Sequence, residues 1–196
     1  MNKVSFGKKL ELWLKGNEPK TLNSLISVFD EKSFAVAFIF LLFIPALPLP
    51  TGGITHIFEI VAMLLAIEMI LGRKTIWLPK RWQNLNISSL TKALPKILNK
   101  INWIEKHSKP HLKGLLKNSL LIRLTGFILF IFCLSAFLAP PFSGLDTLPS
   151  LAVVLLGLSL IFEDIYIYIS GILVGIIGIG LVISLGVALF NSFKWF

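Results

Sequence analysis

The chain has 196 residues, of which 55% are hydrophobic and only 15% are charged. A soluble domain usually carries roughly 25% charged residues, so this composition argues against a soluble globular protein and predicts an all-α integral membrane protein. The formal net charge is +9, and the single cysteine, Cys133, excludes an internal disulfide or a metal site built on several cysteines.

Residues 1–33 are predicted to form a cytoplasmic amphipathic arm. Large apolar residues recur on one face of a helix over residues 3–15: Phe6, Leu10, Trp13 and Leu14. Charged residues occupy the opposite face, and a second short helix follows Thr21. Such helices suit the membrane interface. Packing against the cytoplasmic face of the protein explains the same pattern, and the sequence leaves both roles open.

Residues 34–72 are predicted to form a first membrane hairpin. Two apolar runs, 34–49 and 54–71, flank a short break that includes Pro48, Pro50, Gly52 and Gly53. A helix cannot continue through this break, because proline lacks the amide donor and glycine leaves the backbone unrestrained. The break is either an external turn or the tip of a re-entrant segment, and Arg73 stops the second run.

Residues 73–123 form a basic linker, in which twelve Lys and Arg accompany a single acid, Glu105. Two basic amphipathic helices are predicted within residues 92–122, where they would lie on the inner leaflet or cap the bundle. Anionic lipid is an expected partner, since acidic head groups attract such residues by about 1 kcal/mol each. No nucleic-acid-binding module is recognisable, so no nucleic-acid partner is predicted.

Residues 124–164 repeat the organisation of the first hairpin and are predicted to form a second one. Its break contains Pro140, Pro141, Gly144 and Asp146. Charged residues stop its two ends: Arg123, Glu163 and Asp164. A shift of 91 residues superposes both breaks, with Pro50 on Pro141 and Gly53 on Gly144. Because both hairpins begin on the same side, the pseudo-repeat is predicted to be parallel.

Residues 165–196 are predicted to be a Gly-rich C-terminal span. Gly171 and Gly175 have the GxxxG spacing that permits close helix approach, either inside the chain or between copies in a homo-oligomer. The turns predicted at 45–55 and 139–149 hold no Lys or Arg, and basic segments beside spans stay in the cytoplasm. The N-terminus and the linker are therefore placed in the cytoplasm, and five crossings would leave the C-terminus outside unless the last run folds back.

Three ionisable residues lie inside the apolar runs and are the candidate intramembrane polar site: His56, Glu59 and Glu68. Such groups are functional hypotheses by default, because burying a charge in lipid is costly. His56 and Glu59 share a helix face, whereas Glu68 lies on the opposite face and could pair with Arg73, Lys74, Lys32 or Arg123. Glu163 and Asp164 are predicted to mark a helix end facing the basic linker.

No nucleophile–base–acid set, metal motif or phosphate-binding loop is recognisable in the sequence. We therefore predict no catalytic residue, no metal and no cofactor, and a protein that is not an enzyme.

Several short signatures occur in a characteristic order: the Pro-Leu-Pro turn, Leu71-Gly-Arg73 with Trp77-Leu-Pro79, Lys109-Pro-His-Leu112, and Asp164 seven residues before Gly171. Together they resemble the ExoD family of bacterial exopolysaccharide-synthesis membrane proteins, across residues 20–190. The resemblance implies a multi-pass protein of the bacterial inner membrane that contributes to making or exporting surface polysaccharide, alongside the polysaccharide-synthesis machinery.

The function predicted is a non-catalytic accessory or regulatory role in exopolysaccharide synthesis. The alternative is a small transporter or channel for a proton, an ion or a lipid-linked sugar, with Glu59, His56 and the two breaks lining its path, because transporters bind substrates at broken helices.

Overall fold

The computed structural model describes residues 5–29, 32–48, 55–73, 75–77, 79, 84, 102–108, 118–140 and 143–193. This part of the chain contains helices and no strand, which confirms the all-α class. The helices are α1 (Phe6–Lys15), α2 (Leu22–Phe29), α3 (Ser33–Leu42), α4 (Thr55–Ile70), a short helix at 102–107, α7 (Ser119–Leu138), α8 (Thr147–Phe162) and α9 (Ile165–Phe193).

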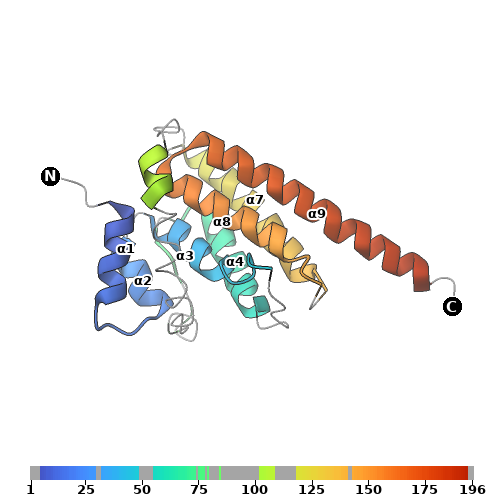
Figure 1. Ribbon diagram of the computed structural model, residues 1–196, viewed down its shortest axis with the longest axis horizontal. Coiled ribbons are helices and arrows are strands. Elements are labelled where there is room, and N and C mark those ends of the chain that lie inside the picture. The colour runs from blue at the N-terminus through green and yellow to red at the C-terminus, as the bar shows by residue number, and fades with distance from the viewer. Residues whose placement is uncertain are drawn as a thin grey trace.

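Four helices, α3, α4, α7 and α8, form a bundle, and α9 lies along α8 (Figure 1). At one end of the molecule lie α1, α2 and the short helix 102–107, whereas α9 extends past the opposite end. We call the first end the inner end and the other, where the α3–α4 and α7–α8 turns lie, the outer end.

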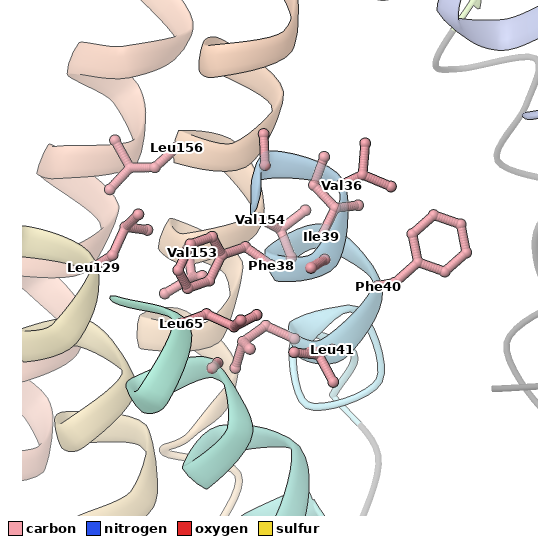
Figure 2. Packing of buried hydrophobic residues seen from close by; sticks show 14 of the residues in the cluster. Val36, Phe38, Ile39, Phe40, Leu41, Leu65, Leu129, Val153, Val154 and Leu156 are labelled. Atoms are coloured by element: carbon pink, nitrogen blue, oxygen red, sulfur yellow. The ribbon is translucent and has the colours of Figure 1, made fainter. Parts of the chain in front are cut away.

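Helix α3 is the centre of this bundle. Nine of its ten residues are buried, as expected for a helix that is apolar all round. Figure 2 shows Phe38 of α3 meeting Leu65 of α4, Leu129 of α7 and Val153 of α8 in a continuous apolar core. The helix ends at Leu42 rather than continuing to residue 49, because Pro45 clashes with the preceding turn and disfavours helical backbone before it.

The amphipathic arm uses its apolar face inside the protein. Leu10 and Leu22 are fully buried and Trp13 nearly so. The Trp13 ring lies edge-on to Phe40 of α3, with ring centroids 6.0 Å apart. Of the two roles that the sequence left open, packing against the rest of the chain is therefore the one observed.

Two helices of the described part are long and apolar enough to cross a membrane: Ser119–Leu138 and Ile165–Ala188. Helix α7 begins earlier than residue 124, because the Asn118 side chain caps it by accepting a hydrogen bond from the Leu120 amide. Arg123 consequently lies inside the helix instead of stopping it, which corrects the predicted boundary.

Close helix contacts recur at an offset of 91 residues. A Cβ on Gly126 of α7 would lie 3.2 Å from the Ala66 carbonyl oxygen of α4, and a Cβ on Gly157 of α8 would lie 3.0 Å from the Ala35 carbonyl oxygen of α3. Gly126 follows Ala35, and Gly157 follows Ala66, by 91 residues. The second helix of each hairpin therefore packs against the first helix of the other hairpin: α4 against α7, and α8 against α3.

The inner ends of α4 and α8 terminate in the same way. Gly72 and Glu163 both adopt left-handed backbone, with φ of 77° and 56°. The next amide then bonds back five residues, from Arg73 to the Glu68 carbonyl at 3.0 Å and from Asp164 to the Ser159 carbonyl at 3.2 Å, as in a Schellman cap. These pairs too are 91 residues apart.

Candidate functional site

The structure brings His56 and Glu59 together at the outer end of α4. They lie one turn apart on the same face of the helix, and His56 Nδ1 is 2.7 Å from Glu59 Oε2. The Glu59 side chain is fully buried, whereas 27% of the His56 side chain is exposed. The pair thus links the bundle interior to its outer surface.

Neighbouring helices complete the surroundings of this pair. Helix α7 contributes the Phe137 ring, whose centroid is 5.2 Å from that of His56, and the fully buried thiol of Cys133. Asp146, immediately before α8, is close enough to interact electrostatically with both His56 and Glu59. Burial raises the pKa of the Asp146 carboxyl above its usual value.

Three buried side-chain oxygens in the described residues have no hydrogen-bond partner: Glu59 Oε1, Ser135 Oγ and Ser150 Oγ. Each lies about one turn from the outer end of its helix, with Glu59 in α4, Ser135 in α7 and Ser150 in α8. Buried polar atoms are normally paired, so unpaired ones call for a specific explanation. Glu59 and Ser150 are also 91 residues apart.

Glu68 lies at the other end of α4, and its surroundings are different. Its Oε2 accepts a hydrogen bond from the Trp77 amide at 2.8 Å, and its Oε1 is 3.9 Å from Arg73 Nη1. Among the predicted partners that the structure describes, Arg73 is thus the one that lies near Glu68. Lys32 donates to the Ile161 carbonyl, and Arg123 lies beside Gly72. Glu68 holds the chain that leaves α4.

Asp164 caps α9 and also reaches the linker, as its predicted position suggested. Its Oδ1 accepts from the Tyr166 amide at 2.8 Å, and its Oδ2 accepts from the Ser108 hydroxyl at 2.9 Å. The linker contact that the structure describes is therefore made by a hydroxyl group. Glu163 occupies the left-handed position that ends α8.

Sequence reasoning missed the role of Glu105. Its carboxylate accepts hydrogen bonds from the amides of Phe6 at 2.9 Å and Gly7 at 3.2 Å, and so caps the N-terminus of α1 from almost a hundred residues away. The glycine at position 7 leaves room for the Asn102 side chain, which would have to move if a Cβ were added there. The one acid in a basic segment was the available signal, but nothing local identified its partner.

The remaining predicted residues belong to turns and packing faces. Pro48 and Pro140 follow α3 and α7 at the outer end, and Gly144 has a φ of 68° that favours glycine. Gly171 meets Leu156 of α8, and Gly175 meets Phe132 of α7, so this pair packs inside the chain. Several predicted residues lie outside the described part: Pro50, Gly52, Gly53, Lys74, Pro141 and most of the 92–122 helices.

Among the residues that the structure describes, no group of three or more His, Cys, Asp and Glu side chains is arranged to hold a metal ion.

Comparisons with known proteins agree with the resemblance seen in the sequence. The uncharacterized protein slr1875 of Synechocystis sp. is 26% identical over 174 residues, which cover 87% of this chain and 81% of that protein. No solved structure matches this chain. The family model described as "Exopolysaccharide synthesis, ExoD" matches residues 10–184. Since that match covers most of the chain, the protein belongs to the ExoD family.

Proposed function

We propose that this protein is an integral membrane component of exopolysaccharide synthesis with a non-catalytic, accessory role. Membership of the ExoD family supports the process, and α9 is the observation that supports the membrane. Its Ile165–Ala188 stretch is long and apolar enough to cross a bilayer. Many of its large apolar side chains point outward, including Ile169, Leu173, Ile176, Ile177 and Ile183. So large an exposed apolar face favours lipid over water as its solvent.

The charges of the described residues favour an orientation with the inner end in the cytoplasm. Lys32, Arg73 and Arg123 lie at the inner ends of the bundle helices, whereas the described residues of the outer turns carry no Lys or Arg. Basic residues beside spans remain on the cytoplasmic side. The protein would then be a multi-pass protein of the bacterial inner membrane, with α1 and α2 in the cytoplasm.

The contacts that recur at 91 residues support a parallel pseudo-repeat. Exchange of helices between the hairpins, through Gly126 on Ala66 and Gly157 on Ala35, is what a two-fold axis along the membrane normal produces. Matching caps at Gly72 and Glu163 agree with it. Two like hairpins would thus form the membrane core, and α9 would be an added span.

An accessory role suits what the described polar groups do. Three carboxylates accept hydrogen bonds from backbone amides: Glu68, Asp164 and Glu105. Such bonds hold helix ends in place and do not bind a substrate. The inner surface, which includes α1 and the helix 102–107, would bind anionic lipid and the polysaccharide-synthesis machinery.

Deletion of the gene and complementation test the process. We expect the deletion to lower surface polysaccharide and the full chain to restore it, and we expect the protein to remain in the membrane after carbonate extraction. A matched control substitutes lysine for Leu173 and Ile177 on the outward face of α9, which should prevent stable insertion. Normal polysaccharide in the deletion strain, or release of the wild-type chain by carbonate, would contradict the proposal.

Orientation is tested with single cysteines in a Cys133→Ser background. Ser143, an exposed residue of the outer turn, and Lys106, an exposed residue of the inner end, are the two positions. We expect an impermeant thiol reagent to label Ser143→Cys from outside intact cells and Lys106→Cys only after lysis. The reverse labelling would reject the orientation.

A further inference from the structure

We propose that His56 and Glu59 form a reversible proton-binding site at the outer end of the bundle. The Glu59 carboxylate would take up one proton through His56, and His56 would connect it to the water outside. This site goes beyond an accessory role, because it gives the protein a means of responding to the proton concentration on the outer side.

The first step of the argument is the unequal environment of the two Glu59 oxygens. Oε2 lies 2.7 Å from His56 Nδ1, whereas Oε1 makes no hydrogen bond within the described residues. The side chain is fully buried, and a buried carboxylate with too few partners is costly. Binding one proton neutralises the carboxylate and so lowers that cost.

The second step is the route by which the proton would arrive. His56 is the more exposed member of the pair, with 27% of its side chain accessible, and an imidazole ring can accept a proton on one nitrogen and release one from the other. When Nε2 takes a proton from water on the outer side, Nδ1 can pass its own proton to Glu59 Oε2, which lies 2.7 Å away. The imidazole is then neutral again, and the carboxyl group is neutral as well. Reversal returns the proton to the same side.

The third step is the identity of the other groups that face the pair. Helix α7 presents the Cys133 thiol and the Phe137 ring, and the start of α8 presents Asp146. Helix α3 has no titratable side chain between Ser33 and Leu42. Asp146 is thus the one other carboxylate near the pair in the described part, and it must be tested separately.

The equivalent position in the second hairpin shows what is particular to the first. Ser150, 91 residues after Glu59, is also fully buried with its hydroxyl unpaired, but a serine does not titrate in this range. The polar site is therefore built at matching places in both hairpins, and only the first hairpin supplies a group that can bind a proton.

Infrared difference titration of the full-length protein in lipid vesicles tests the site, because a buried protonated carboxyl gives its own carbonyl band. For the wild type, we expect a reversible band between about pH 4 and pH 9, the range in which buried carboxyl groups titrate. Glu59→Gln should lose this band. Glu68→Gln is the matched control, with the same substitution on the same helix, and should keep it.

Two further variants keep the test independent of folding defects in Glu59→Gln. His56→Leu should keep the band and shift its midpoint by about one pH unit, since leucine cannot make the hydrogen bond to the carboxyl. Asp146→Asn should keep the band. Persistence of the band in Glu59→Gln, its loss in Asp146→Asn, or an unchanged midpoint in His56→Leu would each overturn the proposal.

Complementation of the deletion strain with Glu59→Gln keeps this proposal separate from the proposed function. The infrared result stands whether or not that variant restores surface polysaccharide, and the polysaccharide result in turn says whether protonation matters for the process.

Discussion

The inner and outer ends of α4 place the same kind of side chain in opposite situations. At the inner end, Glu68 accepts from the Trp77 amide and lies near Arg73. At the outer end, Glu59 has His56 on one oxygen and no hydrogen-bond partner on the other among the described residues. In α4, both oxygens of the Glu68 carboxylate thus have a partner, whereas only one oxygen of the Glu59 carboxylate has one among the described residues.

The same contrast holds for the bundle as a whole. The inner ends of α4 and α8 carry matching caps, each with a left-handed residue and a bond back across five residues. The outer ends hold the unpaired oxygens of Glu59, Ser135 and Ser150. Satisfied groups fix structure, whereas incompletely satisfied ones are kept at a cost that function can explain. The inner end is therefore the structural base of the bundle, and the outer end is where we place its chemistry.

The largest expected effect comes from the helix contacts between the two ends. Gly126→Leu and Gly157→Leu should each lower the free energy of unfolding by about 3 kcal/mol, because the added side chain meets backbone carbonyl oxygens that cannot move aside. Unfolding in detergent followed by tryptophan fluorescence measures this effect.

Gly180→Leu is the matched control, since nothing lies within 4 Å of a Cβ there. It should change stability by less than about 0.5 kcal/mol. If Gly126→Leu is harmful and Gly157→Leu harmless, the two contacts are not equivalent and the paired-hairpin architecture fails.

The next effect separates the two carboxylates of α4. Glu68→Leu should cost about 1–3 kcal/mol, because the Trp77 amide loses its acceptor. Glu59→Leu should be neutral or stabilising, as is common when a poorly satisfied buried charge is replaced by an apolar side chain of similar size. Chemical denaturation of both variants in the same detergent compares them, and equal losses would remove the contrast between the ends.

A smaller, favourable effect is expected where α8 ends. Glu163 holds a left-handed φ of 56° that glycine adopts without strain, and Gly72 occupies the corresponding place after α4. Glu163→Gly should therefore raise stability by about 1 kcal/mol, whereas Gly72→Ala should lower it. Thermal unfolding is the measurement. A loss of stability in Glu163→Gly would show that the Glu163 side chain has a role of its own.

The smallest effect concerns the arm at the inner end. Glu105→Gln weakens the cap on α1 and should speed amide exchange of Phe6 and Gly7 roughly fivefold without changing global stability. Glu11→Gln, which removes an exposed pair with Lys15, serves as the control and should leave these two amides unchanged. Equal exchange in wild type and Glu105→Gln would show that the arm is held by its apolar face alone.

The sequence by itself determined the helical class, the two Pro/Gly breaks and the closeness of His56 and Glu59. These features are local: apolar runs set helices, proline and glycine end them, and a spacing of three residues puts two side chains on one helix face. Pairing of Glu68 with Arg73 was within reach for the same reason, since the two residues flank one helix end. The 91-residue offset was visible too, although only as scattered identities.

Tertiary structure alone decided which helices meet and which polar atoms remain unpaired. Exchange of α4 and α8 between the hairpins depends on Gly126 and Gly157 fitting carbonyl groups far away in the sequence, and Glu105 caps a helix almost a hundred residues distant. Glu59 Oε1 is unpaired because, among the described residues, α7 and α8 place no hydrogen-bond donor within reach of it. Such facts depend on packing between segments, and helical periodicity records which face of a helix is apolar but not which neighbour covers it.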